Sequence, residues 1–374
     1  MKDHIIMTQR FTLGIEEEFQ VVHSQTGQLV SSVSPLLEKG QPLFGDHIKS
    51  EMLQATIELV SDIYPDIATA RSDLRRQRAT LAKLANEQGI ALISAGTHPG
   101  AHWQEQEVTD KERYAQQIEE EQDAGRSLLI FGLHIHVGVE DKELAISMMN
   151  QARRWLPHLL ALSSNSPFWA GRYTGLKSYR TIVWGGSPRN GLPRPMTSRR
   201  DFDAYIQALI DAGCINDIRD IWWDIRPHTL FDTVEFRICD MPATLDDTLA
   251  IAALCQALIA KLSWLYQHDS AALVLPNEYI EENKWRAIRY GLDAEFIDFI
   301  HHRRLSMRDS IYELLDFVQD VANDLNSQHE LDTIRRLLAS SEGTGADRQI
   351  KVYQETGKIQ DVIKLLMEQT MRGI

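Results

Sequence analysis

Alternating apolar and polar residues predict a β-sheet in the first two thirds of the chain. The alternation is clearest at residues 12–22, and residues 48–60 form a second extended segment that is rich in acids. Apolar runs at residues 90–96, 128–139 and 229–239 predict three further strands. We therefore expect one largely antiparallel sheet.

Helical periodicity accounts for most of the remaining chain. Apolar residues three and four positions apart predict helices over residues 66–88, 110–122, 141–162 and 202–212, and through most of the chain after residue 242. Residues 163–200 are rich in glycine and proline and predict a long structured loop, a kind of segment that is usually functional. The fold class is thus α+β, with the sheet packed against a helical C-terminal half.

Composition narrows the class of protein. The 374 residues are 43% hydrophobic, which allows a substantial core, and the formal net charge of -14 argues against a partner with a phosphate backbone. We expect no nucleic-acid partner. The three cysteines are widely spaced and form no Cys-x-x-Cys pair, which fits a reducing cytoplasm.

Two segments bear on membrane association. Residues 1–10 are polar and lack the apolar centre of a signal peptide. Residues 243–266 are the most apolar long stretch, but polar and charged residues interrupt it, which predicts that it is too polar to span a bilayer. We expect a cytoplasmic protein with no membrane partner.

Acidic residues on the first predicted strand are the strongest sign of chemistry. Glu16 and Glu18 share one face of residues 12–22, whereas Ile15, Glu17 and Phe19 share the other. Acids are depleted in strands, so a pair on one face indicates a divalent cation or a basic ligand. The alternative is a solvated edge strand whose acids prevent aggregation.

Other extended segments carry polar residues where a structural strand would have valine. These residues are Glu51 and Glu58, His134 and His136, Arg226, and Glu235 with Arg237. In one sheet they would form a floor of carboxylate, imidazole and guanidinium groups, which suits a nucleotide and Mg²⁺. The alternatives are an exposed Glu51, hydrogen-bonded or zinc-binding histidines, and a salt pair between Glu235 and Arg237.

The glycine-rich loop concentrates arginines, namely Arg180, Arg189, Arg194, Arg199 and Arg200. Guanidinium forks suit carboxylates and phosphates, although solvated surface arginines are the plainer explanation. The chain has neither a Gly-x-x-x-x-Gly-Lys-Ser/Thr nor a Gly-x-Gly-x-x-Gly motif. Any ATP is therefore held by another architecture.

Six motifs in a specific order resemble a known family over nearly the whole chain. They are Gly14-Ile-Glu-Glu-Glu-Phe19, Gly96-Thr-His-Pro99, Gly132-Leu-His-Ile-His-Val-Gly138, Trp223-Asp-Ile-Arg-Pro227, Thr233-Val-Glu-Phe-Arg237 and Gly345-Ala-Asp-Arg-Gln349. Together they resemble the bacterial carboxylate–amine ligases, the YbdK-like or type 2 glutamate–cysteine ligase family. The resemblance implies a glutamine synthetase-like fold, in which a curved, mainly antiparallel sheet has helices on its outer face.

The resemblance also implies a single catalytic domain over residues 1–374, with the active site in residues 1–242 and a mostly helical part in residues 243–374. The concave face of the sheet would bind ATP, metal and glutamate. The metal-binding residues would be Glu16, Glu18, Glu58 and Glu235.

Roles for basic residues follow from the same resemblance. His134 and Arg237 would be catalytic and nucleotide-binding, with Arg237 at the transferred phosphate. Arg180 would hold a substrate carboxylate, with Arg189 and Arg226 as further substrate-binding residues. Arg348 lies in a family motif and is a candidate for cofactor binding.

The implied reaction is an ATP-dependent ligation with Mg²⁺, or Mn²⁺ in its place. The glutamate γ-carboxylate would be phosphorylated by ATP and then attacked by cysteine or another amine. The partners would be these small molecules, with a homodimer as a possible assembly. Three alternatives remain at this point: another amine acceptor, a guanidino-type phosphotransferase, and a non-catalytic nucleotide or metal sensor.

Overall fold

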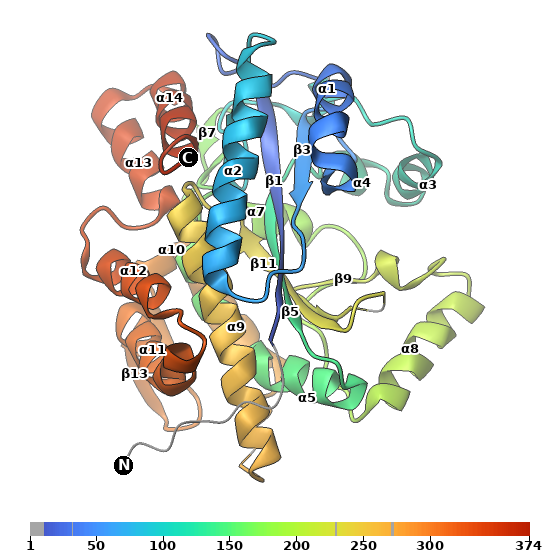
Figure 1. Ribbon diagram of the computed structural model, residues 1–374, viewed down its shortest axis with the longest axis vertical. Coiled ribbons are helices and arrows are strands. Elements are labelled where there is room, and N and C mark those ends of the chain that lie inside the picture. The colour runs from blue at the N-terminus through green and yellow to red at the C-terminus, as the bar shows by residue number, and fades with distance from the viewer. Residues whose placement is uncertain (1–10, 32, 229, 271–272) are drawn as a thin grey trace.

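A seven-stranded antiparallel sheet forms the centre of the computed structural model, which describes residues 11–31, 33–228, 230–270 and 273–374 (Figure 1). Its strands run in the order β10-β11-β5-β1-β3-β2, and β4 pairs with the second half of β1. The strands are β1 (Leu13–His23), β2 (Ile48–Ser50), β3 (Thr56–Val60), β4 (Ile90–Ile93), β5 (Gly132–Gly138), β10 (Ile225–Pro227) and β11 (Thr233–Asp240). The predicted antiparallel sheet is confirmed.

Two predictions touch residues outside the described ranges. The segment 1–10, from which we expect no signal peptide, lies wholly outside them. Residue 229, the first of the predicted strand 229–239, also lies outside, and the strand begins at Thr233.

Helices cover the outer face of the sheet, as Figure 1 shows for α2 and α9. Helix α9 contacts β1 and β5, α2 contacts β4, and α5 and α6 contact β11. Side-chain caps fix where the two longest helices begin: Asp66 accepts from the Thr69 amide, and Thr244 accepts from the Asp247 amide. The helices are α2 (Ile67–Asn86), α5 (Lys142–Ala152), α6 (Leu156–Ser163) and α9 (Leu245–Gln267).

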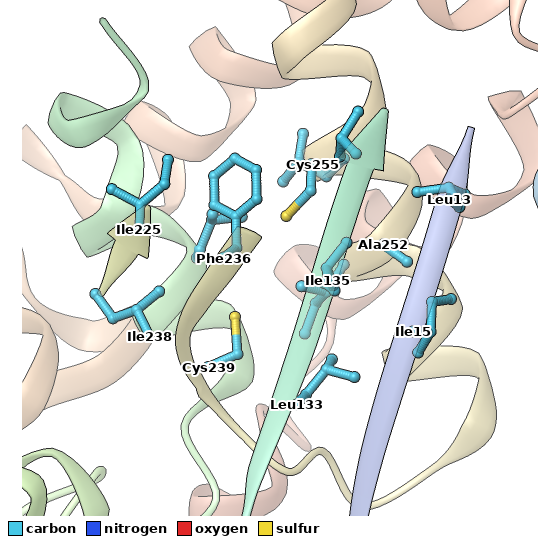
Figure 2. Packing of buried hydrophobic residues seen from close by; sticks show 14 of the residues in the cluster. Leu13, Ile15, Leu133, Ile135, Ile225, Phe236, Ile238, Cys239, Ala252 and Cys255 are labelled. Atoms are coloured by element: carbon cyan, nitrogen blue, oxygen red, sulfur yellow. The ribbon is translucent and has the colours of Figure 1, made fainter. Parts of the chain in front are cut away.

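The core lies between this sheet and α9. Figure 2 shows Ile15, Ile135 and Phe236 of three neighbouring strands pointing toward Ala252 and Cys255 of α9. Helix α9 is long and apolar enough to cross a membrane by length and composition, although its polar residues predict otherwise. Within the protein, 83% of its apolar stretch is buried, so its apolarity fits a core helix.

The remaining elements surround the sheet and fill the C-terminal half. Four short strands follow α6 and precede β10 along the chain: β6 (Phe168–Trp169), β7 (Arg172–Tyr173), β8 (Asn190–Gly191) and β9 (Trp222–Trp223). The other helices are α1 (Ser34–Phe44), α3 (Glu112–Glu121), α4 (Asp123–Arg126), α7 (Arg180–Trp184), α8 (Arg199–Asp211), α10 (Asn277–Tyr290), α11 (Met307–Asp324), α12 (Gln328–Ala339), α13 (Gly345–Thr356) and α14 (Ile359–Thr370).

Three secondary-structure predictions require correction. The extended segment 48–60 is two antiparallel strands, β2 and β3, because residues 51–55 turn the chain back on itself. The single helix over residues 141–162 is broken by a 3-10 turn at Arg153–Trp155, because Pro157 cannot donate a backbone hydrogen bond and therefore sits in the first turn of a new helix, α6. The helical C-terminal half also contains an antiparallel hairpin of β12 (Glu295–Asp298) and β13 (Arg303–Ser306).

Candidate active site

Strand β1 separates its three consecutive glutamates as the alternation predicts. The side chains of Glu16 and Glu18 line a cavity and keep 20% and 15% of their surface exposed. Glu17 points to the opposite face, where it is fully buried and ion-paired to Arg78. The solvated edge strand is excluded, because β1 is a central strand with neighbours on both sides.

The register of the sheet brings the other predicted residues beside this pair. Glu18 lies opposite Glu58 of β3, and Glu16 lies opposite His134 of β5. Glu235 of β11 lies opposite His136 of β5. Since paired residues on adjacent strands have neighbouring side chains, residues far apart in the chain form one polar floor.

Glu16 is the centre of this floor. One carboxylate oxygen lies 3.0 Å from His134 Nδ1, and the other lies 3.2 Å from His136 Nε2. Burial opposes ionisation of Glu16, but hydrogen bonds with the two imidazoles hold its pKa well below the ordinary value. Glu16 is therefore a carboxylate that both rings orient.

Among the residues that the structure describes, two groups of three potential metal ligands share Glu16. The first is Glu16, Glu58 and His134, and the second is Glu16, His136 and Glu235; within each group the ligand atoms lie within 4.8 Å of one another. Neither group contains a cysteine, which disfavours a structural zinc site. Carboxylate oxygens dominate the floor, so its donor set fits Mg²⁺, and the imidazoles leave Mn²⁺ as an alternative.

Carboxylates crowd the β3 side of the floor. Burial, together with the nearby charges of Glu51, Glu16 and Glu18, raises the pKa of Glu58 well above its ordinary value. Burial and the charge of Glu51 raise the pKa of Glu18 to about 7. A bound cation would relieve this repulsion. Glu51 thus belongs to the site, rather than being merely exposed.

We expect Glu58→Gln to stabilise the metal-free protein while removing part of the metal site. The amide keeps the shape of the side chain but lacks the charge that its neighbours repel, so the free energy of unfolding at pH 8 should rise by about 1 kcal/mol or more. Thermal unfolding with chelator and with MgCl₂ measures both effects. A variant that Mg²⁺ stabilises as much as it stabilises the wild type would contradict the assignment.

Guanidinium groups lie at the β11 side of the floor. The Glu235 carboxylate accepts from Arg226 Nε at 2.6 Å and from Arg237 Nη1. Burial opposes its ionisation, but the two arginines hold the pKa of Glu235 well below the ordinary value. The salt pair that the sequence allows is therefore present, and it lies inside the site.

Arg180 enters the cavity from α7. Its side chain is 3% exposed and donates to the backbone carbonyls of Ile238 and Arg237 at 3.4 and 3.3 Å, where β11 has a bulge in its pairing with β5. It forms no ion pair within the described part of the chain. Its charge favours the ionised forms of Glu18 and Asp240 nearby. A buried arginine that contacts no carboxylate directly is suited to receive an anion.

Gly132 provides the space that Arg180 occupies. A Cβ at Gly132 would lie 2.4 Å from Arg180 Nη2 and 3.1 Å from His134 Nε2. The atom nearest to it is the end of a long side chain, which can move without disrupting the sheet. Gly132→Ala should therefore displace Arg180 and lower kcat/KM by about 10²-fold while the protein stays folded.

The matched control is Gly138→Ala at the other end of β5. Its Cβ would crowd Thr12 Oγ1 at 2.4 Å, so it places a similar demand on the same strand without touching Arg180. Steady-state kinetics and thermal unfolding of both variants test this prediction. Equal losses of activity in the two would show that strand damage, not Arg180, is responsible.

The cavity over this floor has a volume of about 470 Å³. Aromatic and apolar side chains line part of the cavity: Met52, Leu53, Tyr114, Leu128, Ile130, Trp184, Trp222, Leu230 and Phe231. Basic side chains also line it: Lys49, Lys111, Arg113 and Arg219. A surface depression of about 560 Å³ beside α2 has only one lysine, one glutamate and one asparagine for chemistry, so we place the site at the sheet.

Two predicted site residues do not reach the cavity. Arg348 donates to Asp247, Gln369 and a backbone carbonyl, which fixes it between α13, α9 and α14, away from the cavity. Cofactor binding by Arg348 is therefore not supported by its position. Arg189 does not line the cavity: it donates to the carbonyl of Asp220, and its guanidinium lies 5.7 Å from the ring of the lining residue Trp222.

Sequence reasoning missed several residues of the site. Tyr114 and Lys111 come from the start of α3, which appears in the sequence only as a charged helix. Trp184 lies with its ring 5.9 Å from the guanidinium carbons of both Arg180 and Arg237. Its place four residues after Arg180, on the same helical face, was the available signal.

Comparison with known proteins places these observations in a family. The family described as glutamate–cysteine ligase family 2 matches residues 12–365. A relative from Sorangium cellulosum, provisionally named glutamate–cysteine ligase 2, is 47% identical over 99% of this chain and 98% of its own. A relative from Solibacter usitatus with the same provisional name is 44% identical over 97% of this chain and 94% of its own.

Solved structures with low sequence identity share the fold. The glutamate–cysteine ligase of Francisella tularensis, solved in complex with AMP, has a TM-score of 0.74 at 14% identity and covers 96% of this chain and 89% of its own. A bifunctional glutathione synthetase from Pasteurella multocida has a TM-score of 0.70 at 14% identity, over 96% of this chain and 52% of its own. The predicted fold class is thereby confirmed.

Proposed function

Because the chain belongs to glutamate–cysteine ligase family 2, we propose that it is an ATP-dependent ligase that joins the γ-carboxylate of glutamate to the amine of cysteine or of a related small molecule. One observation carries the proposal: two groups of metal ligands share Glu16 on the floor of a cavity that also holds Arg180, Arg226 and Arg237. Such a floor provides for a cation and for phosphate and carboxylate anions together.

The chemistry has two steps, because a carboxylate is a poor electrophile. A γ-carboxylate oxygen attacks the γ-phosphorus of ATP, the bond to the β-phosphate oxygen breaks, and an acyl phosphate and ADP form. The amine nitrogen then attacks the acyl carbon, loses a proton and expels phosphate. The products are a γ-glutamyl amide, ADP and phosphate.

Individual residues have distinct parts in this reaction. Mg²⁺ would be held by the two groups that share Glu16, with Glu58 and His134 in one and His136 and Glu235 in the other, and Glu18 lies beside them. The ion when bound supplies positive charge against the phosphate oxygens. Arg237 is fixed by Glu235 and lies at the cavity wall, where it would stabilise the transferring phosphoryl group. Arg180 would hold a carboxylate of the substrate.

Phosphate release from MgATP in the presence of glutamate tests the proposal. Amines are added one at a time, cysteine first, and the coupled product is identified by mass. We expect release that requires ATP, metal, glutamate and an amine, together with a γ-glutamyl amide. Replacing Mg²⁺ by Mn²⁺ in the same assay decides between the two ions.

The outcomes separate the alternatives. Coupling with an amine other than cysteine would keep the ligase and change its acceptor. A phosphorylated guanidino compound, formed without coupling, would replace the ligase by a phosphotransferase. ATP binding without release under any combination of carboxylate and amine would favour a sensor.

A further inference from the structure

We propose that Asp240, which lies outside the cavity, is a positioning residue that sets Arg180 for substrate binding. The inference rests on the proposed function, because Arg180 is the residue assigned there to the substrate carboxylate. Asp240 is the last residue of β11, three positions after Arg237. It is absent from the cavity lining and fully buried.

Asp240 is a hub for hydrogen-bond donors. One carboxylate oxygen accepts from the backbone amide of Asn165 at 2.8 Å and from Ser166 Oγ at 2.7 Å. The other accepts from Ser178 Oγ at 2.8 Å. No cation lies within ion-pair distance of it among the described residues; burial raises the pKa of Asp240, and the nearby charge of Arg180 and the three hydrogen bonds favour its ionised form. A buried carboxylate is costly to desolvate, so three neutral donors converging on it indicate a specific task.

The hub dictates the direction of the next hydrogen bonds. An ionised carboxylate only accepts, and each serine hydroxyl has one proton, which it donates to Asp240. The oxygen of Ser166 is then left to accept from the backbone amide of Arg180 at 3.0 Å. The oxygen of Ser178 likewise accepts from the hydroxyl of Thr181 at 2.8 Å. Asp240 thereby fixes the first turn of α7.

The same strand holds the other end of Arg180. The carbonyls of Arg237 and Ile238, which accept from its guanidinium, lie three and two residues before Asp240 in β11. Arg180 is thus held at its backbone amide by Ser166 and at its guanidinium by the carbonyls at the β11 bulge. Its Nε, by contrast, is buried and has no acceptor among the described residues.

The hub is closely packed and adjoins a C-terminal motif. A Cβ at Gly96 would lie 2.7 Å from Asp240 Cγ, which leaves no room for a longer acid. Asn165, whose backbone amide donates to Asp240, accepts at its side-chain Oδ1 from Gln349 of α13 at 2.7 Å. A Cβ at Gly345 would lie 2.0 Å from the same Oδ1. The motif of residues 345–349 therefore supports the hub, while its Arg348 stays away from the cavity.

Asp240→Asn tests this assignment with little change in shape. An amide keeps one accepting oxygen and replaces the other with an NH2 donor, so the donors on one side of Asp240 lose their acceptor and the first turn of α7 is loosened. We expect the KM for glutamate to rise about 10-fold or more, with kcat and the KM for ATP within about 2-fold of wild type. Adding Asp240→Asn to Arg180→Gln should change the KM for glutamate no further.

Two further variants keep the test decisive. Cys239→Ala alters the neighbouring residue, which points into the core in Figure 2, and should lower stability without raising the KM for glutamate. Ser166→Ala removes the acceptor for the Arg180 amide and should repeat the KM effect even where Asp240→Asn fails to fold. Equal rises in both KM values, or fully multiplicative effects in the double variant, would overturn the assignment.

Failure of the proposed function is recognised separately. It appears as a wild-type protein without glutamate-dependent turnover. A crystal structure of Asp240→Asn, or of Ser166→Ala, then decides: a displaced Arg180 supports the positioning role, and a guanidinium still bonded to the carbonyls of Arg237 and Ile238 refutes it.

Discussion

Glu16→Gln is expected to reduce kcat/KM by about 10³-fold or more, a loss of roughly 4 kcal/mol of transition-state stabilisation. Glu16 is the one residue shared by both groups of metal ligands, and its carboxylate also orients His134 and His136. Glutamine keeps the size of the side chain but offers one neutral oxygen, so both groups lose an anionic ligand together. No other single substitution on the floor affects both groups.

The measurement is steady-state kinetics over a range of MgCl₂ concentrations, together with thermal unfolding. The variant should stay folded, because glutamine keeps the size of the side chain at the cavity and leaves the packed core unchanged. Full activity restored by saturating Mg²⁺ would show that Glu16 contributes to affinity for the ion alone. Unchanged kcat/KM at every concentration would remove Glu16 from the site.

Glu17→Gln, one residue along the same strand, is expected to have the opposite profile: a loss of about 3–5 kcal/mol in the free energy of unfolding, with kcat/KM of the folded protein nearly unchanged. Glu17 and Arg78 are 0% and 1% exposed, and Arg78 Nε donates to the carboxylate at 3.0 Å. Arg78 also donates to Thr248 of α9 at 3.1 Å. Removing the carboxylate leaves a buried guanidinium uncompensated.

Denaturant unfolding measures this loss, and the double variant Glu17→Met with Arg78→Met is its control. Two apolar side chains of similar length leave no buried charge, so the double variant should be more stable than Glu17→Gln alone. If the double variant were the less stable of the two, the ion pair itself would be a net source of stability. Kinetics on the fraction that remains folded keeps stability separate from catalysis.

The family, the ligase class and the sheet could be predicted because local patterns carry them. Alternation alone placed Glu16 and Glu18 on one face and Glu17 on the other, and that arrangement is confirmed. The grouping of Glu58, His134 and Glu235 around Glu16 required the register of three strands, which the motif order supplied through the family resemblance. The roles of these residues remain predictions.

Other features depend on contacts that no local pattern records. Asp240 accepts hydrogen bonds from the buried hydroxyls of Ser166 and Ser178, which lie more than 60 residues earlier in the chain. A single acid at the end of a predicted strand does not indicate these contacts. Arg348 lies in a motif as ordered as the others, yet it binds Asp247 and not the cavity. The motif identified Arg348 as a candidate functional residue but did not predict which residues it contacts.

The central place of β1 in the sheet has a consequence for folding. β1 is the first strand of the described residues, yet its partner β5 begins more than 100 residues later, and β11, which completes the floor, ends at Asp240. Contacts between residues so distant in sequence require the closure of long loops, which slows folding. During synthesis, the acids of β1 therefore have no imidazole or guanidinium neighbours until β5 and β11 have been made. Folding is expected to be slow and to depend on these later strands.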